Sequence, residues 1–356
     1  MDQVTHLVSG VIQGRFFASR SELTHILPIT ILGALIPDID IITILWGKEE
    51  YVIHHRALSH GIFFSFLWAF LIISIVKGTK KDLSKNFARF FLIALICILG
   101  HLYLDLMTSY GTSILSPALK NRYALDAMFI VDPIYWLILL IAYFFMKVKR
   151  VNKKSLYTVL VIIWFLYPLA CLATKLYVEH KMERRYAHLK VNIIPDLFTP
   201  FMWKVIIQDG DNFSLRVYNI LTKEEAQIKN FKRFNLPNPS YDWEKDRFLN
   251  FFLKQFLRFP VEESEGDHIT IYDLRFYPTL DFQRNIRKSS PFALKIAKDL
   301  SGKLMWYEYG GKRKHLNNEV FLHQPKELEE QALIAHFPDP SKRCFTPNGK
   351  DLCGRT

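Results

Sequence analysis

The long apolar runs of this chain all lie in its first half, and this uneven distribution most constrains what the chain can fold into. Half of the 356 residues are hydrophobic, yet the long apolar stretches end before residue 180. The clear candidates for membrane-spanning helices are residues 62–76, 88–107, 130–146 and 156–177. Their lengths are near the ~20 residues that a helix needs to cross a bilayer. The sequence therefore predicts a mainly α, multi-pass membrane helical bundle followed by a soluble segment.

Two further apolar segments precede these candidates. Residues 23–45 are apolar but are interrupted by Pro37-Asp38-Ile39-Asp40. Proline disfavours a helical conformation at the residue before it, so the two aspartates are expected where a helix stops, as in the broken helices that line polar sites. Residues 4–17 form a weaker apolar helix, joined to the next by a polar turn. If the two segments form an antiparallel hairpin, His6 returns to the level of the carboxylates.

The basic residues indicate an orientation in the membrane. Much of the excess behind the net charge of +12 lies in short connections, namely Arg15 and Arg20, residues 77–89 and residues 147–154. The positive-inside rule explains these charges more simply than nucleic acid does, so no nucleic-acid partner is expected. We expect the three connections to face the cytoplasm. The ionisable clusters and the C-terminal domain would then be extracytoplasmic, with membrane lipids, including anionic headgroups, as partners.

From about residue 190 the sequence pattern changes to that of a soluble β-rich domain. Residues 203–208 and 213–218 flank a hairpin-like turn at Asp209-Gly210-Asp211-Asn212. His268 to Phe276 resembles a strand, and a Ser301-Gly302 turn precedes another apolar stretch over 303–309. The predicted organisation is a membrane-embedded helical domain over 1–178, a connector over 179–189 and a β-rich soluble domain over 190–356.

The four cysteines show no metal-binding pattern. Cys97 and Cys171 lie in apolar segments and are expected to be packing residues. Cys344 and Cys353 could form a disulfide if the C-terminal end faces an oxidising compartment, and the sequence leaves that pairing open. No cleavable signal peptide is expected, because the first twenty residues lack a basic segment ahead of the apolar stretch.

Three clusters of histidine and aspartate indicate a metal site. His101 and Asp105 are four residues apart and share one face of a helix, where they could bind a metal or simply form a hydrogen-bonded pair. His55 and His60 lie in a short loop that alone could be solvated, and Asp38 and Asp40 could merely end a helix. Ionisable groups at membrane depth are costly and usually functional, and these groups are ligands for divalent cations. The candidate ligands are His6, Asp38, Asp40, His55, His60, His101 and Asp105.

Seven ligands are too many for one tetrahedral zinc, so the sequence is compatible with one or two ions of Zn, Mn or Mg. Arg56 could hold an anionic group such as phosphate. An interfacial anchor is the favoured interpretation of Arg122. The stretch Thr108-Ser109-Tyr110-Gly111-Thr112 could shape a pocket or simply form a turn. Asp132 before Pro133 is expected to begin a helix, and the role of Asp126 stays open.

These residues fall within longer stretches that resemble the YdjM-type family of LexA-regulated, inner-membrane-bound proteins, which are regarded as metal-dependent hydrolases. The matching stretches are Met1-Asp-x-Val-Thr-His6, Leu32-Gly-Ala-Leu-Ile-Pro-Asp-Ile-Asp40, His55-Arg56-x-x-Ser-His60, His101-Leu-x-Leu-Asp105, Thr108-Ser-Tyr-Gly-Thr112, Arg122-Tyr-Ala-Leu-Asp126 and Asp132-Pro133. They cover residues 1–135, and the segments at 201–204 and 273–276 resemble the family's soluble tail. Gly100 and Ala57 are departures that leave the proposed ligands in place. The resemblance implies a multi-pass bacterial membrane protein with metal-dependent hydrolase activity, and it supplies no substrate.

The function expected from these observations is hydrolysis of a phosphoester or lipid-linked substrate near the bilayer surface, with a metal-activated water as nucleophile and Arg56 stabilising the anionic group. Intramembrane proteolysis is disfavoured because no His-Glu-x-x-His motif is present. One alternative is a non-enzymatic membrane scaffold or interaction protein stabilised by metal. Another is an ion or proton pathway, which would string its ligands across the membrane instead of gathering them at one face.

Overall fold

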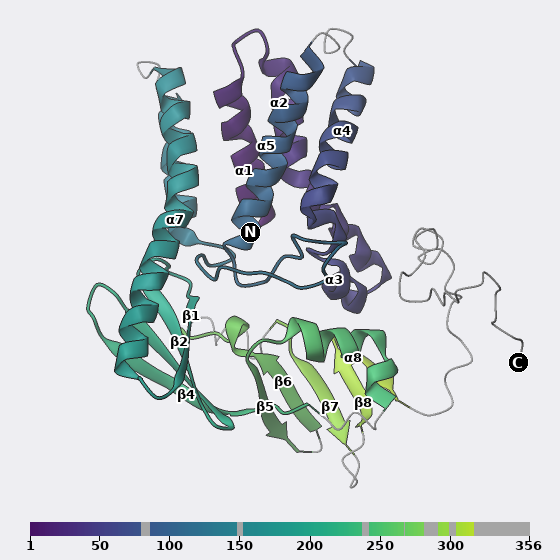
Figure 1. Cartoon of the computed structure of the whole chain (residues 1–356), viewed down its shortest axis with the longest axis vertical. Coiled ribbons are helices and arrows are strands. Elements are labelled where there is room, and N and C mark those ends of the chain that lie inside the picture. The colour runs from purple at the N-terminus through teal and green to yellow at the C-terminus, as the bar shows by residue number, and fades with distance from the viewer. Residues whose placement is uncertain are drawn as a thin grey trace, which may run out of the picture. The chain divides into compact units, whose positions relative to one another are not determined.

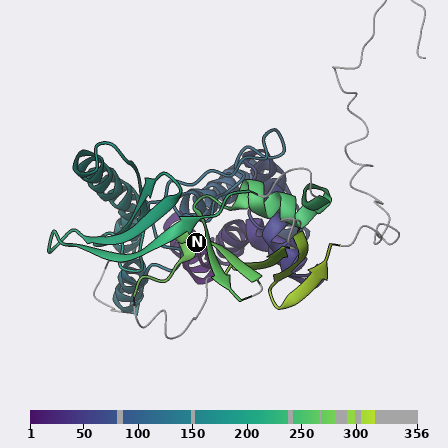
Figure 2. The same cartoon turned by 90° about the horizontal axis from the view of Figure 1, so that it is seen from below.

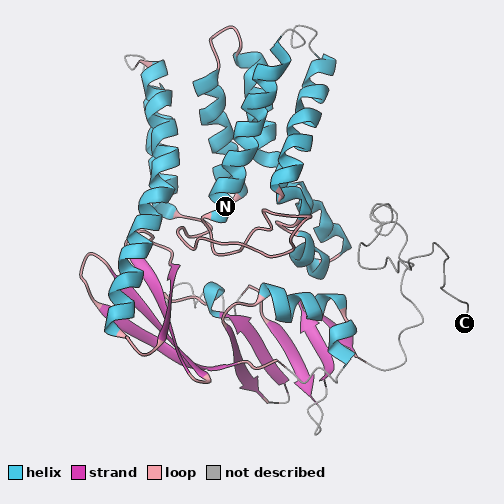
Figure 3. Cartoon of the chain, viewed as in Figure 1, coloured by secondary structure: helices cyan, strands magenta, loops and turns pink. Residues whose placement is uncertain are grey.

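The computed structural model describes residues 1–79, 86–147, 152–236, 242–266, 268–280, 291–298 and 304–316. Residues Met1–His315 form one compact unit. Within this unit helices occupy the first part of the chain and strands the second, as Figure 3 shows. The expected class, a helical N-terminal half followed by a β-rich C-terminal domain, is confirmed. The domain boundaries at 178 and 190 stay a prediction.

The helical part begins with a hairpin and ends with a long helix. Its elements are α1 (Gln3–Phe17), α2 (Leu23–Leu35), the 3₁₀ helix η1 (Ile36–Trp46), α3 (Lys48–His54), η2 (Leu58–His60), α4 (Ile62–Thr79), α5 (Phe87–Leu106), α6 (Pro133–Lys147) and α7 (Lys153–Arg185). Figure 1 shows the α1–α2 turn, the facing ends of α4 and α5 and the start of α7 at one end of the helices. The sheet lies beyond the other end, and Figure 2 looks along the helices from the sheet side.

Among the described residues, three helical stretches are long and apolar enough to cross a membrane: Leu23–Trp46, Phe87–Leu106 and Lys153–Arg185. A fourth would be the pair Lys48–His60 and Ile62–Val76, which is bent by 77°. The spans expected at 88–107 and 156–177 therefore correspond to α5 and α7, and the span expected at 62–76 is one arm of the bent pair. The span expected at 130–146 corresponds to α6, whose 15 residues fall short of the ~20 needed.

The hairpin expected from residues 4–45 is present, and α1 packs closely on α2 through small residues. A Cβ atom at Gly10 would lie 2.8 Å from the carbonyl oxygen of Thr30 and 2.9 Å from the Cβ of Ala34. Glycine and alanine let two helix backbones approach in this way. The α2 helix stops at Leu35, and Pro37 is near the start of the 3₁₀ helix that carries Asp38 and Asp40. The break predicted from the proline is therefore where the sequence indicated it.

The second part of the unit is a nine-stranded antiparallel sheet in which each strand pairs with the next along the chain. The strands are β1 (Lys190–Pro195), β2 (Met202–Asp209), β3 (Asn212–Asn219), β4 (Glu225–Arg233), β5 (Pro260–Glu265), β6 (His268–Asp273), β7 (Leu294–Lys298), β8 (Leu304–Tyr309) and β9 (Lys312–His315). The predicted hairpin is confirmed, with Asp209 opposite Asn212. The strand expected over 268–276 ends at Asp273, where the 3₁₀ helix η6 (Leu274–Phe276) begins. The predicted turn at 301–302 lies outside the described residues.

The helix α7 connects the two parts without a break. It has 33 residues, or roughly 50 Å at 1.5 Å per residue, and it extends through most of the connector expected at 179–189. Val178 and Met182 near its C-terminal end are fully buried against a cluster of the sheet that includes Trp203. The same helix therefore has an apolar stretch long enough to span a bilayer and a last part that packs on the sheet.

Candidate metal site

The side chain of His101, which α5 contributes, is held by the last turn of α2. The Nδ1 atom of His101 lies 2.7 Å from the carbonyl oxygen of Ala34, and the ring is buried. Because a carbonyl only accepts, Nδ1 carries the proton and the Nε2 of the neutral ring keeps its lone pair. A metal-ligating histidine is commonly oriented in this way by a hydrogen bond to its other nitrogen. His101 therefore presents an electron-pair donor to the interior of the site.

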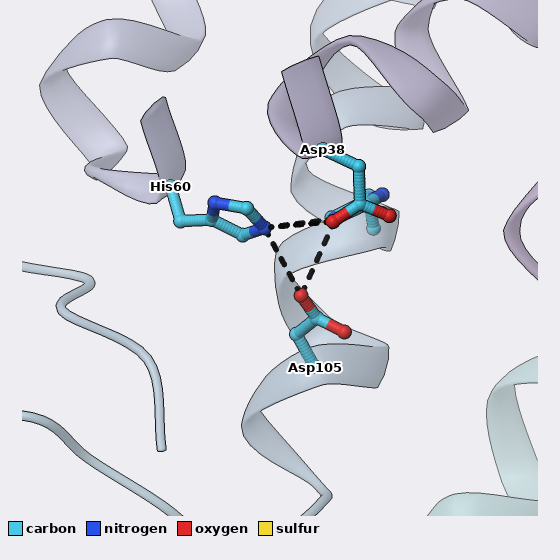
Figure 4. Close-up of side chains that lie close together, drawn as sticks. Asp38, His60 and Asp105 are labelled. Carbon is cyan, nitrogen blue, oxygen red and sulfur yellow. Dashed lines mark hydrogen bonds and ion pairs between the residues drawn. The ribbon is translucent and has the colours of Figure 1, made fainter. Parts of the chain in front are cut away.

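His60 approaches from the turn between α3 and α4. Its Nε2 lies 3.2 Å from Nε2 of His101, 3.4 Å from Oδ1 of Asp38 and 3.2 Å from Oδ2 of Asp105. Figure 4 shows the imidazole pointing between the two carboxylates. Its Nδ1 lies 3.0 Å from the hydroxyl of Ser59 and 3.2 Å from Oδ2 of Asp40. The contacts of Nδ1 with Ser59 and Asp40 therefore orient the ring so that its Nε2 faces the other potential ligands.

These four side chains form a buried cluster that could hold a metal ion. One donor atom from each of Asp38, His60, His101 and Asp105 lies within 4.8 Å of the others. The Oδ2 atom of Asp105 is buried and accepts no hydrogen bond from the described residues, although it lies 3.2 and 3.3 Å from the two Nε2 atoms. With His101 in the tautomer above, its Nε2 cannot donate to that oxygen. A divalent cation suits such a set of facing lone pairs, so the residues present fit a metal.

A second group shares one carboxylate with the first. Donor atoms of Asp38, Asp40 and His55 also lie within 4.8 Å of one another. The Nδ1 of His55 is 2.9 Å from Oδ1 of Asp40, and the ring stacks on Tyr51 at a centroid distance of 4.7 Å. The side chain of His55 is 14% exposed, whereas His60 and Asp105 are 0% exposed. The second group is therefore the more accessible of the two.

Arg56 lies behind the carboxylates in a backbone conformation with φ of 57°. Its main-chain N–H donates to Asp40, its Nη2 lies 2.8 Å from Oδ1 of Asp105, and its Nη1 donates to the hydroxyl of Thr108 at 2.8 Å. The guanidinium stacks over Tyr110 at 5.2 Å, and its Nε has no acceptor among the described residues. The arrangement orients Asp105 and leaves one N–H of the guanidinium for another anion.

His6 lies beside the first group and outside both sets of converging atoms. Its Nε2 is 3.1 Å from Oδ1 of Asp105, and its ring stacks on His101 at 3.7 Å. The seven predicted ligands are therefore brought to one region, six of them in two sets that share Asp38 and the seventh in contact with Asp105. Their action as ligands stays a prediction.

The structure also places the residues whose roles the sequence left open. Arg122, expected as an interfacial anchor, instead donates to the carbonyls of Val52 and Ile53 at 3.2 and 3.1 Å.

Asp126 forms a bidentate ion pair with Arg258, with distances of 3.0 and 2.8 Å, which joins the helical part to the sheet. Asp132 caps α6 as expected by accepting from the N–H groups of residues 134 and 135.

Sequence reasoning missed several supporting groups. The backbone carbonyl of Ala34 and the stacked ring of Tyr51 carry no sequence signal for a role at a metal site. The sequence predicts a pocket or a turn at Thr108, whereas the structure shows its hydroxyl accepting from Arg56 and donating to the carbonyl of Asp105. Cys97 and Cys171 are free and buried as expected, whereas Cys344 and Cys353 lie outside the described residues.

The fold and the site together define a class: a helical membrane protein whose broken helices enclose a histidine–aspartate cluster and which carries a β-sheet domain. The chain belongs to the family of YdjM inner membrane proteins, whose family profile matches residues 1–178. It is also similar to the uncharacterized protein YfhP of Bacillus subtilis (strain 168), with 24% identity over 286 residues that cover 72% of this chain and 86% of that protein. No solved structure matches the chain.

Proposed function

We propose that this chain is a membrane-bound, metal-dependent hydrolase acting on a phosphoester or lipid-linked substrate near the bilayer surface. The observation that carries the proposal is the pair of ligand sets that share Asp38. A bound divalent cation would lower the pKa of a water molecule and polarise the scissile group. Asp38, His60, His101 and Asp105 would hold one ion, and Asp38, Asp40 and His55 would hold a second.

The protein's own groups supply the remaining chemistry. Oδ1 of Asp40 fixes Nδ1 of His55, so this ring has one oriented nitrogen and is partly open to solvent. The Nε of Arg56, which has no acceptor among the described residues, is a donor for an anionic group of the substrate, and Arg56 also pairs with Asp105 and orients it. Acyl-chain or headgroup substrates suit a site located at the end of apolar helices.

The alternative is a scaffold in which metal holds the broken helices together. It is favoured by the burial of the first group, because a closed ligand shell without an open position is typical of structural sites. The exposure of His55 in the second group favours hydrolysis. The two functions therefore differ in what the second group does.

The test uses the full-length protein purified in detergent. We expect His60→Ala, His101→Ala and Asp105→Ala each to lose bound metal, measured by mass spectrometry of the element, while the exposed His188→Ala keeps it. His55→Ala should keep the first ion and lose turnover on a panel of phosphoester and lipid substrates. Full metal content in all three ligand variants would remove the site. Metal-dependent stability without any turnover by the unmodified protein would favour the scaffold.

The orientation in the membrane is part of the proposal. We infer from the basic connections that residues 77–89 and 147–154 face the cytoplasm, and the site and the sheet would then lie outside it. We expect cysteines introduced at exposed positions such as Lys190 or Leu221 to react with an impermeant maleimide added to intact cells. A cysteine introduced at the α1–α2 turn, at Ser21, should react only after the cells are opened. The reverse pattern of labelling would overturn the orientation.

A further inference from the structure

A cavity separate from the metal ligands lies between the loop that follows α5 and the sheet. Its volume is about 470 Å³, within the range of ~300–1,000 Å³ that is usual for small-molecule sites. Apolar side chains dominate its lining, including Phe129, Ile130, Phe276 and Phe292. Two cations, Lys204 and Arg275, also line it. A mostly apolar cavity with a few polar groups is the usual form of a ligand site.

Lys204 is an unusual residue for the interior of a sheet domain. Side chains alternate across β2, so Trp203 and Val205 pack toward the cluster that contacts α7, and Lys204 projects from the other face with Ile206. Its side chain is buried, with 2% exposure. The ammonium donates to the carbonyl oxygens of Arg275 and Tyr277 at 3.0 and 2.8 Å. An ammonium has three N–H donors, so one is left over among the described contacts.

The charges of the two cations are balanced differently. Arg275 pairs with Asp273 at 3.1 Å and donates to the carbonyl of Ser109 at 2.9 Å. In the described part of the chain, no carboxylate lies within 4.0 Å of the Lys204 ammonium. Burying a charge without a direct partner is costly. Burial accordingly lowers the pKa of Lys204, although the charges of the buried Asp196 and Asp273 oppose that shift. The cavity wall therefore has an ammonium with no carboxylate in direct contact within the described residues, and an anion in the cavity could accept from its remaining N–H.

We propose that this cavity binds an anionic amphiphile, with a phosphate or carboxylate headgroup at Lys204 and an acyl chain along the aromatic wall. The apolar lining is what distinguishes such a ligand from a small soluble anion. The cavity also reaches Val131, which is 43% exposed and immediately precedes the cap of α6, so a chain could enter it from the level where apolar helices begin. The site is separate from the metal ligands, and the proposal does not depend on hydrolysis.

The experiment measures ligand binding to the full-length protein in a nonionic detergent by native mass spectrometry. The probes are dioleoyl phosphatidic acid, oleate, the uncharged dioleoylglycerol and inorganic phosphate. The unmodified protein should bind the first two, and Lys204→Met should bind them about 10-fold more weakly or worse, as expected when one partner of a buried charge pair is removed. The matched control Lys190→Met changes an exposed lysine of the neighbouring strand and should bind as the unmodified protein does.

A second variant keeps the proposal testable if Lys204→Met does not fold. Ile130→Trp fills the apolar part of the cavity and keeps the contacts of the ammonium, so it should also weaken binding of both amphiphiles. Unchanged binding by either variant would overturn the proposal. Equal binding of dioleoylglycerol would show that the charge is not recognised. Binding of inorganic phosphate as tight as that of the lipid would show that no acyl chain is needed, and either result would equally overturn it.

Discussion

The close packing of α1 on α2 leads to a prediction about metal affinity at a residue that is not a ligand. In Gly10→Ala the new Cβ would lie 2.9 Å from the Cβ of Ala34 and 2.8 Å from the carbonyl oxygen of Thr30. Ordinary contacts of this kind begin at 3.4 Å, so α2 must retreat by 3.4 − 2.9 = 0.5 Å or more. Backbone atoms cannot rotate away, and the displacement therefore falls on the α2 main chain.

The displaced residue is the one that orients His101. The Nδ1 of His101 lies 2.7 Å from the carbonyl oxygen of Ala34, and a displacement of that carbonyl by 0.5 Å directly away from the ring would lengthen the distance to 3.2 Å. A shift toward 1 Å would take it past ~3.6 Å, where a hydrogen bond is lost. Loss of such an orienting contact costs ~10- to 100-fold in metal affinity. Because a distance of 3.2 Å weakens the hydrogen bond without breaking it, we expect Gly10→Ala to lower the metal affinity toward the lower end of that range, about 10-fold, measured by competition with a chelator of known affinity.

Gly14→Ala is the matched control. It makes the same change one turn further along α1, but its nearest neighbour is the rotatable hydroxyl of Thr30 instead of the α2 backbone. Both variants should lower the melting temperature, because both crowd the same helix pair. Only Gly10→Ala should weaken metal binding strongly. Equal losses of affinity in the two variants, or an unchanged affinity in Gly10→Ala, would refute the link through Ala34.

Two further predictions concern a charge at the site and one outside it. Arg56→Lys should keep the bound metal but lose most turnover, because the single nitrogen of lysine cannot reproduce the planar fork that reaches Asp105 and Thr108 from two separate nitrogens and keeps a third for another acceptor; unchanged turnover would remove Arg56 from the mechanism. Burial raises the pKa of Asp132 to about 6, against hydrogen bonds from the start of α6 and from Tyr167 that lower it. The folded state therefore binds this proton more tightly than the unfolded chain, and the group adds up to roughly 3 kcal/mol to the free energy of unfolding as pH falls from 7 to 4. Asp132→Asn keeps the cap and should flatten that part of the pH dependence of the melting temperature; an unchanged slope would contradict this.

The features that the sequence predicted well are those with a local physical cause. Pro37 ends α2 where its ring excludes a regular helix, and a spacing of four places His101 and Asp105 on one face of α5. The Asp209–Asn212 turn joins two strands with alternating apolar residues, so β2 and β3 were also predictable. The hairpin of α1 and α2 followed from one short polar turn between two apolar segments, and it is what brings His6 to Asp105.

The features that could not be predicted depend on tertiary contacts. The carbonyl of Ala34 becomes the partner of His101 only because α2 and α5 pack together. Arg56 reaches Asp105 from an irregular turn whose left-handed φ has no clear signal in its sequence. Arg122 resembled an anchor for the interface because arginines at helix ends often are, and the structure instead directs it to the backbone of α3. The pair of Asp126 and Arg258 joins residues 132 positions apart, which no local pattern could indicate.

The unbroken course of α7 makes the sheet sensitive to the thickness of the surrounding bilayer. A helix longer than the hydrocarbon layer accommodates a thinner membrane by tilting, and a continuous helix carries a tilt along its whole length. Because Val178 and Met182 are packed against the sheet cluster of Trp203, the strands must follow that motion or lose buried contacts. Lys204 is next to Trp203 on the same strand, on the opposite face. A change in lipid composition would therefore be transmitted mechanically to the wall of a cavity in the soluble domain.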